Sequence, residues 1–149
     1  MTECVARSIA SLAIIAQADE VRRASAWLGQ TGSQNGVPAN QIGRLDLCLN
    51  ETLANVISHG GGNAAAAPVW LRLEVNREQG LGEASVSVSN AGPAFDSANT
   101  PPKSKATTLA EAEPGGLGLT MIRGFSDALA YRYVDGRNEL TFSVHWSEA

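Results

Sequence analysis

The order of polar and apolar positions along the chain predicts alternating helices and strands. Amphipathic helices are expected at residues 19–30 and from about 38 to 59, because apolar residues recur there every three to four positions. The first helix should stop at Gly32 and the second at Gly60–Gly62, since glycine adopts the left-handed backbone that ends a helix. The pattern at residues 5–14 indicates a first strand.

From residue 69 onward the period changes from helical to alternating. Residues 69–76, "VWLRLEVN", place Val or Leu at every second position, and "ASVSVSN" (84–90) alternates Val with Ser. A long loop to about Gly115 and a short helix at 117–125 follow, and then "LAYRYV", "DGRN" and "ELTFSVHW" read as a β-hairpin. One-sided alternation predicts an α/β two-layer sandwich with a mixed, mostly antiparallel sheet covered on one face by helices.

Length and composition narrow the class of protein. The chain has 149 residues with no internal repeat or linker, so we expect a single domain spanning residues 1–149. A net charge of −4 argues against a nucleic-acid or membrane surface. The N-terminal apolar run has neither the basic flank of a signal peptide nor the length of a membrane span, so a cytoplasmic protein is expected. Cys4 and Cys48 are too few for a disulfide framework, and Cys48 is expected to be buried as a small apolar residue. The three tryptophans belong to no motif and are interpreted as packing or interface residues: Trp27, Trp70 and Trp146.

A row of polar residues runs along the second helix. Glu51, Asn55 and His59 stand one turn apart and therefore share one stripe. The opposite stripe is nearly all apolar: Leu45, Cys48, Leu49, Thr52, Leu53, Val56 and Ile57. Glu51 and Asn55 line either a cleft or a solvated helix face. His59, in the last turn, is explained by capping and by the helix dipole.

A second cluster is glycine-rich and leads into the short helix. Gly115, Gly116 and Gly118 allow close approach of a ligand, and the first N–H groups of a helix favour an anion. The alternative is a flexible loop without a ligand. Mg²⁺ commonly takes one or two protein ligands and fills its shell with water and phosphate oxygens. Asn55 therefore suffices as protein ligand if a triphosphate is bound, and Glu51 is placed to accept a proton.

Three motifs in this order resemble the GHKL, or histidine-kinase-like, ATPase superfamily: "NETLAN", "SNAGPAFD" and "PGGLGL". The tail "GLGLTMIRGFSDALAYRYVDGRNELTF" is most similar to the anti-sigma-factor serine-protein kinases, and the resemblance covers roughly residues 10–146. It implies binding of ATP and Mg²⁺, phosphorylation of a serine on an anti-anti-sigma partner of the STAS type, and sequestration of a sigma factor. A homodimer is expected, partly from this family and partly to cover the N-terminal strand and the first helix.

The resemblance also assigns roles to residues. Glu51 becomes the catalytic carboxylate and Asn55 the Mg²⁺ ligand, while Asn90 and Gly92 lie at the adenine. The phosphates are lined by Gly116, Leu117, Gly118 and Leu119. Lys103 and Lys105 fall where such folds carry a lid over ATP, and they either reach the phosphates or lie in a solvated loop.

Asn90 departs from the pattern of the family, which has Asp at this position. A neutral carbonyl replaces a charged acceptor for the adenine amino group, and this loses on the order of 1 kcal/mol, roughly five- to tenfold in affinity. Asp96 is too far along the turn to be taken as a substitute. The alternative function is therefore a nucleotide-defective protein-binding module that keeps the GHKL fold. A detached histidine-kinase domain is less favoured, because no helical-bundle segment precedes the fold and His59 lies on the wrong element.

Overall fold

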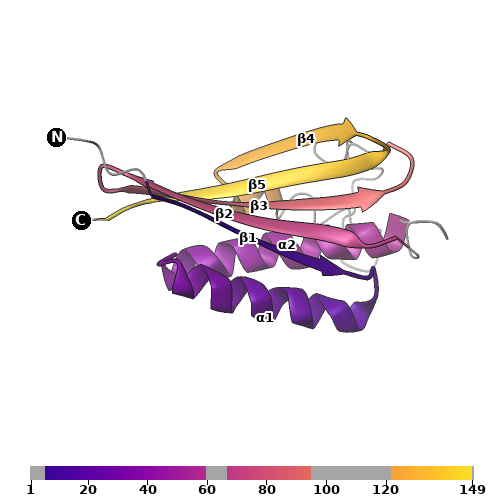
Figure 1. The fold of residues 1–149 in the computed structure, drawn as a ribbon, viewed down its shortest axis with the longest axis horizontal. Helices are drawn as coiled ribbons and strands as arrows, with labels where there is room; N and C mark the ends of the chain where they lie inside the picture. Colours follow the sequence, from indigo (N-terminus) through magenta and orange to yellow (C-terminus); the bar gives the residue numbers. More distant parts are fainter. Residues whose placement is uncertain (1–5, 60–66, 95–121, 149) are drawn as a thin grey trace, which may run out of the picture.

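In the part of the chain that the structure describes, one antiparallel sheet is covered by two long helices (Figure 1). The structure, a computed structural model, describes residues 6–59, 67–94 and 122–148. The described strands form a five-stranded sheet in the order β1-β2-β3-β5-β4, and every pairing between them is antiparallel. The elements are β1 (Ala6–Ile14), α1 (Ala18–Gln34), α2 (Ala39–His59), β2 (Val69–Glu78), β3 (Leu81–Ala91), β4 (Ala128–Val134) and β5 (Arg137–Ser147). Both helices lie on the same face of the sheet, which confirms the predicted two-layer α/β fold.

The core lies between the helices and the covered face of the sheet. The predicted alternation in β2 is confirmed, because its Val and Leu positions are at most 2% exposed whereas Trp70 is 52% exposed on the open face. The buried set in β2 is Val69, Leu71, Leu73 and Val75. Leu45, Leu49 and Leu53 on α2 are each 0 or 1% exposed and pack over these strands. Burial of about twenty such side chains is the main stabilising contribution to a domain of this size.

The predicted end of the first helix at Gly32 is wrong. α1 continues to Gln34, and Gly32 is buried inside it. A Cβ at Gly32 would lie 3.2 Å from Cγ1 of Ile42 on α2, so the glycine permits close packing of the two helices. The helix ends instead at Asn35 and Gly36, where Gly36 has φ +78° and the side chain of Asn35 donates to the Thr31 carbonyl at 2.8 Å.

The apolar stripe of α2 is confirmed except at its last member. Ile57 is 37% exposed, whereas Leu53, one turn earlier, is 1% exposed. Positions 45, 49, 53 and 57 advance by four residues per step, and at 3.6 residues per turn three such steps rotate the side chain by about 120°. Ile57 has therefore turned away from the sheet at the end of a helix this long.

The predicted C-terminal hairpin is confirmed as the pair β4 and β5. Asp135 and Gly136 form its two-residue turn with φ of 54° and 75°, the positive values that a type I′ turn requires. The short helix predicted at 117–125 is confirmed for Ile122–Phe125, and its earlier part lies outside the described residues, as do Gly60–Gly62. Within the described ranges, no helix is long and apolar enough to cross a membrane.

Candidate functional site

Asn55 is the buried polar residue around which the site is built. Its side chain belongs to a residue only 7% exposed, in the second-last turn of α2. The Oδ1 atom is fully buried and accepts no hydrogen bond from the described part of the chain. An unsatisfied buried acceptor costs about 1–3 kcal/mol. Such an amide oxygen fits a hard cation such as Mg²⁺, which prefers oxygen ligands and needs few of them from the protein.

Glu51 lies one turn before Asn55 on the same helix. It is half-buried, and it forms no hydrogen bond or ion pair with a described residue. Asn50 beside it is engaged differently, because its Nδ2 donates to the Asp46 carbonyl at 2.7 Å. The Glu51 carboxyl group therefore lies one helical turn from Asn55. The side chain of His59 is not among those described, so its capping role stays a prediction.

Asn90 lies near the end of β3, and Gly92 is the first residue after it. Asn90 is half-buried and pairs in register with Asn138 of β5, so its side chain lies on the sheet face that the helices cover. Gly92 has φ +145°, and a Cβ there would meet no described atom within 4 Å. With respect to the described residues, backbone conformation rather than crowding is what requires glycine at this position.

The described site residues converge on one end of the molecule. The C-terminal ends of α2 and β3 and the β4–β5 turn lie together at the right of Figure 1. Gly92 N–H donates to the Gly136 carbonyl at 3.2 Å, which ties the end of β3 to that turn. The predicted phosphate-side residues lie outside the described ranges, so their roles stay predictions: Lys103, Lys105, Gly116, Leu117, Gly118 and Leu119.

Arg44 fixes the segment that precedes β4 against α2. Its guanidinium donates to the Phe125 carbonyl at 3.0 Å and to Oδ1 of Asp127 at 3.0 Å. The hydrogen bond from Arg44 holds the pKa of the Asp127 carboxyl below its ordinary value, and the backbone N–H of His145 adds to this effect. Ile122 is fully buried, and its carbonyl lies 3.8 Å from Sγ of Cys48. The last turn of the predicted glycine-led helix is thus docked on α2.

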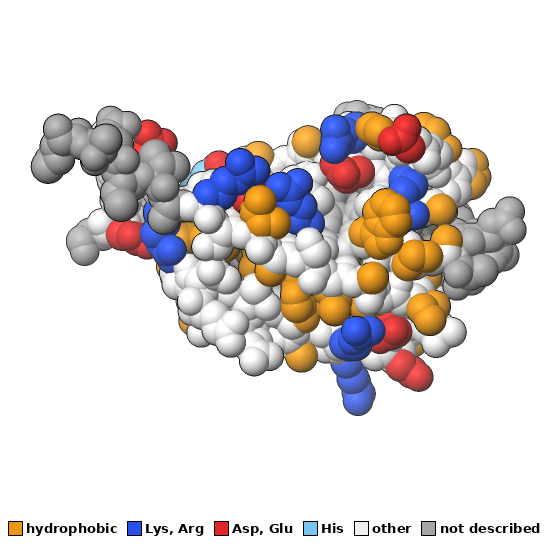
Figure 2. Space-filling view, in the orientation of Figure 1, with side chains coloured by type: hydrophobic (Ala, Val, Ile, Leu, Met, Phe, Trp, Pro, Cys, Tyr) orange, Lys and Arg blue, Asp and Glu red, His pale blue; other side chains and the backbone are white. Residues whose placement is uncertain are grey.

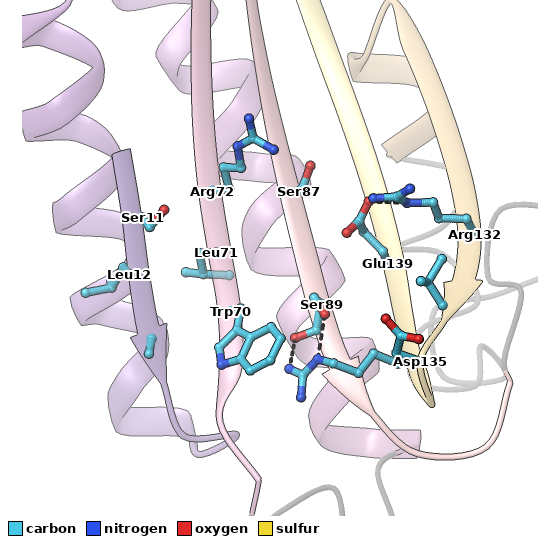
Figure 3. A pocket seen from close by; sticks show the side chains of 13 residues that line it. Ser11, Leu12, Trp70, Leu71, Arg72, Ser87, Ser89, Arg132, Asp135 and Glu139 are labelled. Carbon is cyan, nitrogen blue, oxygen red and sulfur yellow. Dashed lines mark hydrogen bonds and ion pairs between the residues drawn. The ribbon is translucent and has the colours of Figure 1, made fainter. Parts of the chain in front are cut away.

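A hollow of about 700 Å³ lies on the opposite, open face of the sheet (Figure 3). Arg137 reaches across β3, donates to Oγ of Ser89 at 2.8 Å and stacks over Trp70 at 3.6 Å from the ring centroid. Charged side chains of both signs and hydrophobic side chains lie interspersed over the strands (Figure 2). Of the predicted site residues that the structure describes, none lines this hollow, so it is separate from the Asn55 and Asn90 region.

The remaining cysteine and tryptophan predictions are partly tested. Cys48 is 1% exposed, and burial raises the pKa of its thiol to about 11, which agrees with a packing role. Cys4 lies outside the described residues. Trp27 and Trp146 pack against the core as predicted, and Trp70 carries the Arg137 stack on the open face.

Comparison with known proteins decides the family. Residues 14–144 match the family described as "Histidine kinase-like ATPase domain". The chain belongs to this family. The superfamily predicted from the three motifs is thereby confirmed, and with it the interpretation of the fold as an ATPase-type domain.

Two relatives show how this member of the family compares with others. The chain is 33% identical over 119 residues to "Serine/threonine-protein kinase BtrW" of Bordetella bronchiseptica, covering 80% of this chain and 81% of the relative. It also resembles the crystal structure of the RsbU and RsbW domains of Rv1364c from Mycobacterium tuberculosis. That likeness has a TM-score of 0.59 and 15% identity, and it covers 91% of this chain and 32% of that one. The first relative supports the resemblance to serine kinases, and the second supports the fold.

Three residues near the site were missed from the sequence. Arg44 contacts a segment 81 to 83 positions away, and Asn138 and Tyr133 contact the end of β3 from more than 40 positions away. No local sequence pattern indicates these long-range contacts. The periodicity of each helix or strand depends on its apolar residues and does not show which polar residue contacts a distant segment. The "DGRN" turn that fixes the hairpin register was the available hint for Asn138.

Proposed function

We propose that this protein binds ATP with Mg²⁺ and transfers the γ-phosphoryl group to a serine of a STAS-type anti-anti-sigma partner. The proposal includes sequestration of a sigma factor by the unengaged protein. The observation that carries it is the buried Oδ1 of Asn55, which has no described hydrogen-bond donor, one turn from the half-buried Glu51. Membership of the ATPase-domain family and the kinase relative support the same reading.

Each residue has a defined task in this mechanism. Mg²⁺, when bound, neutralises phosphate charge during transfer. Oδ1 of Asn55 would hold the ion, and Glu51 would take the proton of the attacking serine hydroxyl. The serine oxygen bonds to the γ-phosphorus while the bond from that phosphorus to the β–γ bridging oxygen breaks, and ADP leaves. Asn90 accepts from the adenine amino group as a neutral amide, so affinity is lower than with Asp by roughly five- to tenfold.

Phosphoryl transfer to the partner tests the proposal. Purified protein, radiolabelled ATP with Mg²⁺ and the cognate STAS-type protein should give label on the partner, and Glu51→Gln should reduce the rate at least about a hundredfold. Glu78→Gln is the matched control, because Glu78 is an exposed carboxylate at the far end of β2. Loss of transfer in both variants, or no transfer by wild type to any cognate partner, would contradict the proposal.

Asn90 favours one alternative function, a protein-binding module that keeps the fold without using nucleotide. This alternative predicts that Glu51→Ala leaves capture of the partner unchanged. It also predicts the same partner affinity with and without ATP. A difference in affinity caused by ATP in the wild type would exclude it.

A homodimer formed by the single domain is part of the proposal. β1 is an edge strand of the sheet, and Ile9 on it is 51% exposed. Trp70 on the neighbouring strand is 52% exposed on the same open face. Exposed edges and apolar side chains favour association. Sedimentation equilibrium should give twice the monomer mass, and a monomer at all accessible concentrations would rule this part out.

A further inference from the structure

The backbone of Gly92 is held at both of its polar groups by the β4–β5 hairpin. Its N–H donates to the Gly136 carbonyl at 3.2 Å, and its carbonyl accepts from the hydroxyl of Tyr133 at 2.8 Å. Gly92 lies just beyond β3, where the sheet register no longer fixes the chain. Its φ of +145° is therefore maintained by these two contacts, and both come from the hairpin.

Asn138 holds the next residue of the same segment. Its Nδ2 donates to the Pro93 carbonyl at 3.0 Å, while its Oδ1 accepts from the hydroxyl of Tyr131 at 2.6 Å. Asn138 is 7% exposed and lies directly opposite Asn90 in the β3–β5 register. The amide is used as donor and acceptor at once, and a carboxylate or a hydrocarbon of the same size cannot do both.

The turn of the β4–β5 hairpin fixes the positions of Tyr133 and Asn138. Asp135 and Gly136 adopt the positive φ values of a type I′ turn, which fixes the pairing of β4 with β5. Tyr133 and Asn138 are cross-strand partners in that register, and both reach the end of β3. The hairpin therefore positions the segment Asn90–Pro93 through the backbone carbonyls of Gly92 and Pro93.

We propose that Tyr133 and Asn138 are positioning residues, which hold the Asn90–Pro93 segment in the conformation that presents Asn90 and Gly92 to the adenine. This inference rests on the proposed function, since it assigns the bracing of the same nucleotide site. The Asn90 amide has one acceptor oxygen, whereas a carboxylate has two. The affinity for the adenine amino group therefore depends more on the orientation of the side chain than it would with Asp. A loosened segment should weaken binding of ATP without slowing the transfer step.

Two substitutions separate positioning from general destabilisation. Asn138→Asp keeps the shape and the acceptor for Tyr131 but removes the donor to Pro93, and Tyr133→Phe removes only a hydroxyl from a side chain that is 44% exposed. Loss of one such hydrogen bond should raise the KM for ATP by about three- to tenfold in Asn138→Asp and by about two- to threefold in Tyr133→Phe. The kcat should stay within about twofold, because the catalytic Glu51 is not moved. Arg132→Gln is the control, since Arg132 lies on the same strand, faces the open side and contacts Glu139.

Hydrogen exchange supplies the second readout. Amides of residues 90–92 and 94 should exchange faster in both variants and at the wild-type rate in Arg132→Gln, while amides of β2 and of residues 81–89 of β3 keep their protection. Wild-type protein that binds ATP, with variants whose KM and exchange match it, would overturn the inference and leave the proposed function standing. Wild-type protein that binds no nucleotide would instead remove the proposed function, and the role of the two residues with it. Tyr133→Phe keeps the test valid if Asn138→Asp does not fold.

Discussion

Arg44 on α2 donates a hydrogen bond to Oδ1 of Asp127 at 3.0 Å and so joins the helical layer to the start of β4 across 83 positions of sequence. The same guanidinium donates to the Phe125 carbonyl, and the Asp127 carboxylate accepts from the backbone N–H of His145 at 2.8 Å. One arginine thus fixes the chain between the predicted glycine-rich segment and the hairpin. The contact ties the residue before β4 to α2.

This contact makes stability depend on acid pH. The pKa of Asp127 is lowered from its ordinary value of 3.8 by the hydrogen bond from Arg44, so the folded state favours the ionised carboxylate. The ionised Asp127 carboxylate makes its full contribution to stability above pH 3.8. This contribution is lost as the pH falls through the lower pKa of the folded state. Because the pair is exposed to solvent, the contribution is at most about 1 kcal/mol. Urea unfolding should show that the free energy of unfolding decreases less between neutral pH and pH 3 in Asp127→Asn than in wild type. Equal decreases in the two proteins would contradict a stabilising role of the ionised Asp127 carboxylate.

Cys48 should behave as an inert thiol in the folded protein. Burial raises its pKa from 9.0 to about 11, so at pH 9 about 1% is thiolate when folded and about half when unfolded. In a Cys4→Ser background, thiolate absorbance near 240 nm should be absent at pH 9 in buffer and present in denaturant. Rapid alkylation of the native protein at that pH would show that Cys48 is accessible.

Gly29 and Gly32 provide a matched pair within α1. A Cβ at Gly29 would meet nothing within 4 Å, so Gly29→Ala should raise the free energy of unfolding by about 0.5–1 kcal/mol through the lower backbone entropy of the unfolded chain. A Cβ at Gly32 would lie 3.2 Å from Cγ1 of Ile42. Gly32→Ala should therefore raise the free energy of unfolding by less than Gly29→Ala does, or should lower it. Urea titration of both variants gives the comparison. Equal gains would mean that Ile42 moves freely and that Gly32 has no packing role.

Asn55 should be a residue whose removal stabilises the protein while abolishing the Mg²⁺-dependent part of nucleotide binding. Replacing it by Leu removes the buried acceptor that lacks a donor, so Asn55→Leu should raise the free energy of unfolding by about 1 kcal/mol in the absence of nucleotide. The same variant should lose the dependence of ATP binding on Mg²⁺. A decrease in stability of similar size would indicate that the oxygen is satisfied in the folded protein and would remove the main support for the site.

Local sequence patterns predicted the two layers of this fold. They did not predict contacts between residues that are far apart in the sequence. Alternation placed Val69 and Leu71 in the core because a strand with one covered face leaves a period of two in its sequence. Gly32 was misread because a glycine that ends a helix and a glycine that lets two helices touch look the same along the chain. The brace from Asn138 to Pro93 depends on the β3–β5 register, which a single sequence does not specify.

The candidate site was predictable to the extent that its residues share one helix. Glu51 and Asn55 are one turn apart, so their common stripe follows from helical geometry, and burial of Asn55 is what the structure adds. Asn90 was assigned to the predicted site from its motif alone. Its position opposite Asn138 on the covered face is a property of the sheet.

Titration of ATP into the purified protein by calorimetry, with and without Mg²⁺, tests the central claim most directly. Wild type and Asn90→Asp are compared, with Asn55→Leu as the variant that lacks the metal ligand. The account predicts Mg²⁺-dependent binding by wild type, binding about five- to tenfold tighter by Asn90→Asp, and no Mg²⁺-dependent binding by Asn55→Leu. Binding by Asn90→Asp alone would make the protein a nucleotide-defective binding module. Absence of binding by both would contradict the proposed mechanism while leaving the fold unchanged.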